Sequence, residues 1–135
     1  MHVLVFSQPE RRYNHSVAMV PELLRVGGTL HGELARSDAR VAVVISADLA
    51  HTHLASGPCG FSKAHRSHIA PLLETAARYA QDALSCGYTG IVMLEGLLAA
   101  AARAGNAFVV EQVEGPYHPT YYGMLVALFL PVAMR

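Results

Sequence analysis

Runs of apolar residues at four places along the chain have the length and composition of β-strands. They are His2–Ser7, Val41–Ile45, Ala107–Val113 and Tyr121–Val132. The second run, VAVVI, is β-branched and apolar on both faces, which predicts a strand buried within a parallel or mixed sheet. A turn at Glu114-Gly115-Pro116 is expected to separate the last two strands.

Three other segments carry apolar residues at helical spacing. These predicted helices are Pro21–Ser37, Ser67–Leu84 and Thr89–Ala104. Gly27 and Gly28 weaken the helical propensity of the first, whereas Gly105-Asn106 is a typical signal for the end of the last. Helices that alternate with strands predict an α/β fold. We therefore expect one domain over residues 1–135, with a central mixed sheet flanked by helices.

Composition narrows the classes of function. Hydrophobic residues make up 53% of the chain and charged residues 15%, so another subunit is a candidate to cover part of the apolar surface. Ten acidic residues balance ten Lys and Arg residues, which argues against nucleic-acid binding because that requires a basic face. Two cysteines are too few for a disulfide framework and fit reduced thiols. We expect a cytoplasmic protein without a membrane partner, since no signal-peptide pattern or membrane-length apolar run is present.

The segment SADLAHTH follows the second predicted strand and brings an acid and two histidines together. Ligands tend to bind beyond the carboxyl ends of strands in α/β sheets, where Asp48, His51 and His53 would fall. A histidine there can exchange a proton near neutral pH, and a neighbouring acid can fix its tautomer. On residue type alone, the plainer interpretation is that Asp48 caps a turn while both histidines lie in solvent.

The longer segment VAVVISADLAHTHLASGPCGFS resembles the signature of the class III extradiol ring-cleavage dioxygenases, in their LigB-type catalytic subunit. In that family a hydrophobic strand leads into Ser-Gly/Ala-Asp-Leu-Ser/Ala-His, followed by a Gly-Pro-Tyr-Gly-Phe-like loop. RVGGTLHGELARSDARVAVV before the signature and YHPTYYGMLVALF after it extend the resemblance over most of the chain. The resemblance implies a LigB-like fold that corresponds to the C-terminal half of the family domain and lacks the N-terminal half.

The resemblance also implies a reaction, in which non-haem Fe(II) and O2 open the ring of a catechol-type aromatic diol. His51 would be the acid/base that takes a proton from a substrate hydroxyl, and Asp48 would orient the loop. His53 would line the pocket, where an exposed position is the equal alternative. Gly57, Pro58 and Cys59 would form the substrate-facing loop, with Cys59 at the place where the family has tyrosine.

The metal ligands depart from the family pattern. The two iron-binding histidines of the family belong to its N-terminal half, and neither His2 nor His15 lies in a matching motif. At the start of the last predicted helix the family has a glutamate, whereas SCGYTGIVMLEGLL resembles the Memo-type branch with a Cys-Gly pair. Cys86 is therefore a candidate ligand that would favour zinc or copper over Fe(II), the alternative being a small buried residue. Glu95 is a further candidate acid, with a partly exposed helix position as the plainer interpretation.

Three functions stay open at this point. The first is a dioxygenase-like enzyme that is incomplete without an N-terminal partner half. The second is a non-catalytic LigB-like module that acts by self-association or protein binding. The third is a metal-binding or redox module built on Cys86 and a nearby histidine. An incomplete sheet would leave an open edge, so we expect a homo-oligomer or a partner half, and whether this chain holds a metal by itself stays open.

Overall fold

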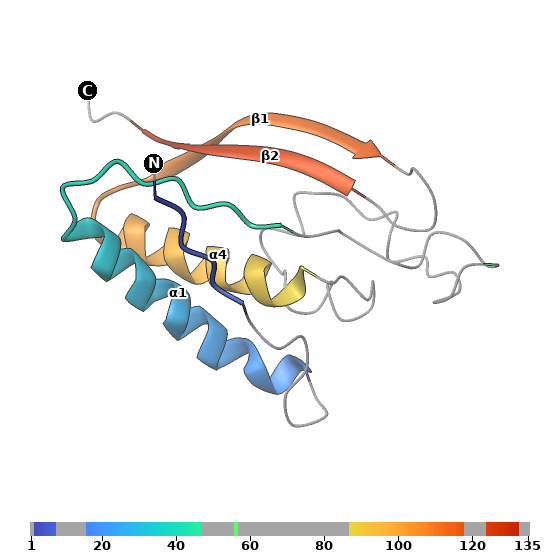
Figure 1. The fold of residues 1–135 in the computed structure, drawn as a ribbon, viewed down its shortest axis with the longest axis horizontal. Helices are drawn as coiled ribbons and strands as arrows, with labels where there is room; N and C mark the ends of the chain where they lie inside the picture. The colour runs from blue at the N-terminus through green and yellow to red at the C-terminus, as the bar shows by residue number, and fades with distance from the viewer. Residues whose placement is uncertain (1, 8–15, 47–55, 57–86, 118–123, 133–135) are drawn as a thin grey trace.

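A computed structural model of the chain describes residues 2–7, 16–46, 56, 87–117 and 124–132 (Figure 1). Its elements are the 3-10 helix η1 (Ser16–Met19), the helices α1 (Val20–Ala35) and α4 (Tyr88–Arg103), and the strands β1 (Phe108–Tyr117) and β2 (Met124–Pro131). The described part of the chain thus combines α-helices with an antiparallel pair of strands. The predicted helix Ser67–Leu84 lies outside the described residues.

Both predicted helices that fall within the described residues are confirmed. Helix α1 has Pro21 in its first turn, where a missing N–H costs nothing, and it ends at Ala35. The next two N–H groups, of Arg36 and Ser37, donate to the carbonyls of Glu33 and Leu34, respectively. Helix α4 ends at Arg103, with Ala104 as its C-cap residue. Gly105 follows, and its φ of +82° lies in the left-handed region that glycine adopts readily. Neither helix combines the length and hydropathy needed to cross a bilayer, within the described residues.

The two helices approach each other so closely that their backbones touch. A Cβ atom on Gly27 of α1 would collide with the carbonyl oxygen of Met93 and lie 2.8 Å from the backbone nitrogen of Leu97. In the same way, a Cβ atom on Gly96 of α4 would collide with the carbonyl oxygen of Leu24. The glycines that weaken α1 in isolation therefore let it pack against α4, and tertiary contact outweighs helical propensity.

The core lies where η1 and α1 meet the first two turns of α4. Its buried members are Met19, Leu23, Tyr88, Val92 and Met93. The Val92 side chain is fully enclosed, with 0% of its surface exposed. Partly buried apolar residues of α1 pack around this group.

The strands β1 and β2 form an antiparallel hairpin whose register corrects one prediction. Glu114-Gly115-Pro116 was expected to be the turn, yet these residues belong to β1, and Glu114 lies opposite Val126 of β2. A register shift between Glu114 and Tyr117 accommodates glycine and proline within the strand, as a bulge does.

The predicted strands His2–Ser7 and Val41–Ile45 are not strands in the structure. No backbone hydrogen bond joins either segment to another described residue. The burial predicted for Val41–Ile45 is also wrong, because Val44 is 83% exposed. In the other segment, Leu4 is 92% exposed. An apolar run buries both faces only when partners cover it, and the described neighbours of these two segments do not.

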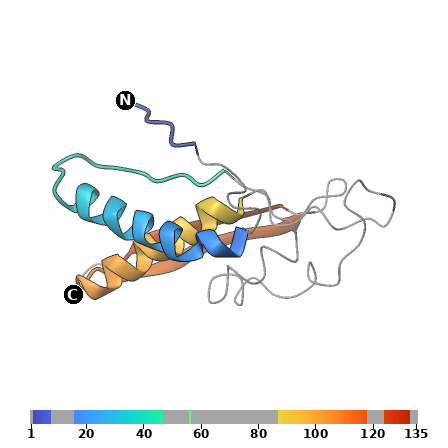
Figure 2. The ribbon, with the colours of Figure 1, turned by 90° about the horizontal axis from the view of Figure 1, so that it is seen from below.

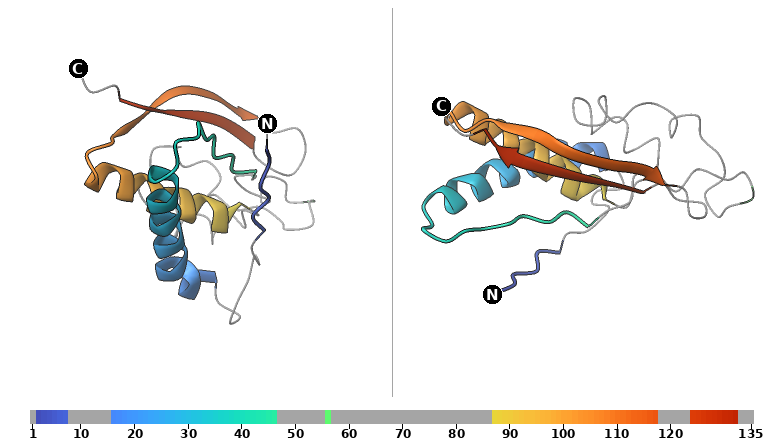
Figure 3. Two further views of the ribbon diagram at one scale, coloured as in Figure 1. Left: turned by 60° about the vertical axis from the view of Figure 1, so that its left-hand side comes forward. Right: turned by 90° about the horizontal axis from the view of Figure 1, so that it is seen from above.

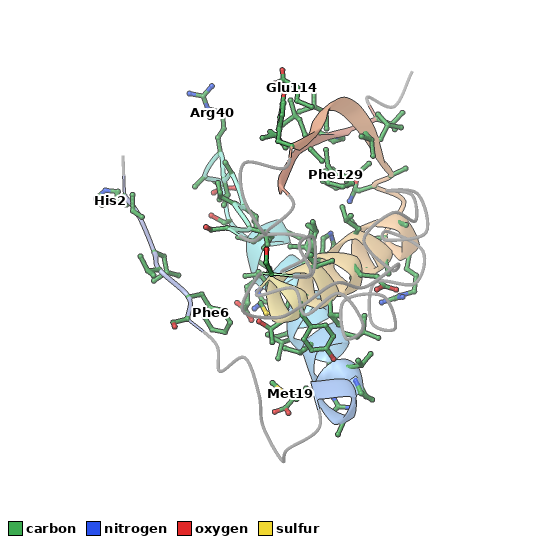
Figure 4. The ribbon with its side chains drawn as sticks, turned by 90° about the vertical axis from the view of Figure 1, so that its right-hand side faces the viewer. His2, Phe6, Met19, Arg40, Glu114 and Phe129 are labelled. Atoms are coloured by element: carbon green, nitrogen blue, oxygen red, sulfur yellow. The ribbon has the colours of Figure 1, made fainter. Side chains whose placement is uncertain are left out.

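The spatial order of these segments is the same in several views. Residues 37–46 pass on the β2 side of the hairpin, and residues 2–7 lie farther out, beyond residues 37–46 (Figures 2 and 3). The helices lie under one face of the hairpin, with Phe129 between the two layers and Glu114 on the opposite face (Figure 4). The outer face of β2 also carries exposed apolar residues, namely Val126, Leu128 and Leu130.

Candidate functional site

The residues with candidate chemistry fall in two segments that the structure does not describe. Asp48, His51 and His53 lie in residues 47–55, and Gly57, Pro58, Cys59 and Cys86 lie in residues 57–86. Their predicted roles stay predictions. The described residues nevertheless include the positions where these segments begin and end, which are Ser46 and Gly87.

A contact between Ile45 and Gly90 brings together the chain before Ser46 and the chain after Gly87. A Cβ atom on Gly90 would lie 2.8 Å from Cγ2 of Ile45, so the isoleucine side chain occupies the space that the missing Cβ leaves. Cγ2 is attached directly to the branched Cβ of isoleucine, and it therefore cannot move aside as a long side-chain end could. The residue that precedes Ser46-Ala47-Asp48 thus packs on the first turn of α4, directly after Cys86-Gly87.

The first turn of α4 combines buried polar groups with a helix start that no side chain caps. Gly87 is the N-cap residue, and its carbonyl accepts a hydrogen bond of 2.9 Å from the Ile91 N–H. Tyr88 and Thr89 follow and are both buried. Burial raises the pKa of the Tyr88 phenol above its ordinary value, because the charged form would lose hydration. Tyr88 therefore stays protonated at neutral pH.

Glu95 lies in the middle of α4 and is half-buried, as the plainer sequence interpretation expects. Burial raises the pKa of its carboxyl group, since desolvation penalises the carboxylate. It lies five residues after Gly90, which is ~7.5 Å along the helix axis. Five residues also turn the chain by ~140° beyond one full turn, so Glu95 lies on a different face of α4 from Gly90.

Within the described ranges, no three His, Cys, Asp or Glu side chains lie close enough together to hold a metal ion. The described ion pair between Arg36 and Glu33 is exposed and belongs to the C-terminal end of α1. His2 is exposed and His31 is half-buried.

Sequence reasoning missed Tyr88 and Thr89 as members of this region. Both follow Cys86-Gly87 directly, and the predicted start of the helix at Thr89 lay one residue after the observed start at Tyr88. A tyrosine and a threonine directly after the candidate ligand were the available signal. Residue type alone does not indicate that both are buried.

Neither a scan against models of known protein families nor a search of curated protein sequences finds a match to this chain. The resemblance to ring-cleavage dioxygenases consequently rests on the quoted segments, of which SADLAH is the most specific.

Proposed function

We propose that this chain is a LigB-like module whose candidate site serves proton transfer to and from a catechol-type aromatic diol, as in extradiol ring cleavage. His51 is the acid/base, Asp48 orients it, and His53 lines the pocket. Gly57-Pro58-Cys59 is the loop that faces the substrate. The sequence resemblance supplies the chemistry of this proposal.

One structural observation supports it, which is the contact between Ile45 and Gly90. Asp48 follows Ile45 by three residues and is therefore at most ~11 Å of chain away from it. Cys86 precedes Gly90 by four residues, at most ~14 Å of chain. The segments that carry the acid/base group and the candidate ligand thus start from one point, as parts of a single site must.

The proposed proton transfer follows from ordinary side-chain chemistry. A neutral imidazole at His51 would accept the proton of a substrate hydroxyl, and the resulting imidazolium would return it later in the reaction. The carboxylate of Asp48 would stabilise the imidazolium and favour one orientation of the ring.

Fe(II) is the cofactor expected from the resemblance, and zinc is the alternative if Cys86 is a ligand. When bound, such a metal would hold the deprotonated diol and, for iron, O2. The described residues offer no cluster of three ligand side chains, so none of them is assigned as a metal ligand.

The test is oxygen consumption by purified protein with catechol, before and after anaerobic loading with Fe(II). Where Fe(II) binds in stoichiometric amount, we expect ring cleavage by the wild type. His51→Asn should then lose about 10²-fold or more of the rate, because general acid–base catalysis contributes that much. His31→Gln on α1 is the matched control and should retain the wild-type rate. Equal rates in the wild type and His51→Asn, or no ring-cleaved product from iron-loaded protein, would contradict the proposal.

A second candidate function is self-association without catalysis, and a separate observation favours it. Fourteen large hydrophobic side chains of the described residues are exposed, and together they expose the equivalent of about eight whole side chains. Covering a Val, Leu or Phe side chain contributes ~1.5–3 kcal/mol. Covering even half of this surface is therefore comparable with the ~4–15 kcal/mol that association costs. Sedimentation of the wild-type protein tests this candidate without reference to catalysis.

A further inference from the structure

Residues 2–7, called the N-terminal arm below, have the apolar composition of a strand but no ladder partner among the described residues. Val3, Leu4, Val5 and Phe6 are each at least 64% exposed, and the backbone of the arm makes no hydrogen bond to another described residue. Figure 4 shows the arm, with His2 and Phe6 labelled, apart from the helices and from the hairpin. Unpaired backbone groups and apolar side chains together make an edge that can pair with another strand.

The arm lies too far out to complete the hairpin of its own chain. Residues 37–46 lie between the arm and the β2 side of the hairpin (Figures 2 and 3). The side of the arm that faces away from residues 37–46 has no described neighbour. A strand from outside the chain can therefore approach the arm on that side without displacing a described residue.

We propose that the arms of two copies of this chain pair antiparallel, edge to edge, across a two-fold axis. Two identical strands in antiparallel arrangement satisfy two-fold symmetry, because each residue meets its partner reciprocally. The sequence HVLVFS contains no Asp, Glu, Lys, Arg or proline, so neither like-charge repulsion nor a missing N–H blocks the pairing. This inference rests on the self-association candidate above and names its surface.

The size of the arm sets the expected affinity. Val3 to Phe6 expose the equivalent of about three whole side chains, or ~200–400 Å² of apolar surface in each copy. A stable interface of standard size buries ~800 Å² for each partner, and weak complexes bury less than ~600 Å². The arm pair alone therefore belongs to the weak class, and we expect a dimer that dissociates on dilution, with a dissociation constant between about 1 µM and 1 mM.

Sedimentation velocity of the whole chain over that concentration range tests the proposal, with Val5→Lys as the variant and Val44→Lys as its matched control. Val5 is 82% exposed and Val44 is 83% exposed, so both substitutions place a lysine at an equally open apolar position. We expect Val5→Lys to raise the dissociation constant about tenfold or more, because a charged side chain on an edge strand opposes edge-to-edge pairing. Val44→Lys should leave the constant unchanged within about twofold.

Two further results separate the outcomes. Circular dichroism should show the same helix content in both variants, and amide exchange of residues 3–6 should slow with rising concentration in the wild type and in Val44→Lys but not in Val5→Lys. A wild type that dimerises while both lysine variants behave alike would overturn the arm pairing and leave self-association through another surface. A wild type that stays monomeric throughout would overturn both. Neither outcome bears on the proposed ring-cleavage chemistry, which is measured by oxygen consumption.

Discussion

The helix pair and the extended segments are both apolar, yet they have opposite fates. The apolar residues of α1 and α4 meet across backbones in contact, and Val92 between them is fully enclosed. The apolar residues of the N-terminal arm and of residues 41–44 lie open to solvent. The difference is the presence of a complementary partner, since the same kind of side chain is buried wherever a matching surface exists.

The largest expected effect comes from filling the space between the helices. Gly27→Val should lower the free energy of unfolding by about 3 kcal/mol or more, because its side chain would meet the Met93 carbonyl and force the helices apart. Urea unfolding followed by circular dichroism measures this loss. Gly32→Ala on the same helix is the control, because no atom lies within 4 Å of its added Cβ. It should gain about 0.5–1 kcal/mol from helical propensity.

The next largest loss of stability is expected when atoms are removed from the enclosed core. Val92→Ala should cost about 1.5–3 kcal/mol, since two methyl groups leave a site that has no exposed surface. The same urea experiment measures this cost. A loss below ~0.5 kcal/mol would mean that the neighbouring side chains collapse into the space, and the contrast between the two regions would then be weaker than burial indicates.

A smaller effect, dependent on pH, is expected at Glu95. Burial raises its pKa in the folded state, so the folded state holds the proton more tightly than the unfolded state. This stronger binding of the proton stabilises the folded state. The stabilisation is fully present below the ordinary pKa range of a carboxyl group and is lost as the pH rises through the raised pKa of Glu95. Thermal unfolding at several pH values should show Glu95→Gln more stable than the wild type at pH 7, with a difference that vanishes in acid.

Glu33→Gln is the control for this prediction. Glu33 is exposed and pairs with Arg36, so its replacement should leave stability at pH 7 unchanged or lower it slightly. A Glu95→Gln variant that is less stable than the wild type at neutral pH would indicate that the carboxylate is stabilised by a partner.

The smallest effect on folding is expected on the outer face of the hairpin. Leu128 is 45% exposed, and Leu128→Gln should change the free energy of unfolding by no more than about 0.5 kcal/mol. Urea unfolding of both variants compares the loss of stability at exposed Leu128 with the loss at enclosed Val92. A loss as large as that of Val92→Ala would show that Leu128 is covered in solution by another surface.

The helices could be predicted from the sequence because their signal is local. Pro21 near the start of α1 and Gly105 after α4 mark boundaries that the structure reproduces within about two residues. The hairpin was predicted as two strands, but its turn was misplaced because Gly115-Pro116 is accommodated by a register shift that depends on β2.

Residues 41–45 show the limit of reading burial from a sequence. The run VAVVI is apolar on both faces, which indicates that covering partners are needed but does not supply them. The candidate site has the same limit. Residue types and spacing could nominate Asp48 and His51, whereas the contact of Ile45 with α4 depends on the missing Cβ of Gly90, which is far away in sequence.

The backbone contact between α1 and α4 also restricts how the molecule can move. A slide of one helix along the other by a single residue would drive a side chain into a carbonyl where Gly27 and Gly96 now fit. We therefore expect α1 and α4 to move together as one rigid unit, without hinge or shear motion between them. Because α4 begins directly after Cys86-Gly87, the proposed site at that end of α4 would be supported by this rigid helix pair.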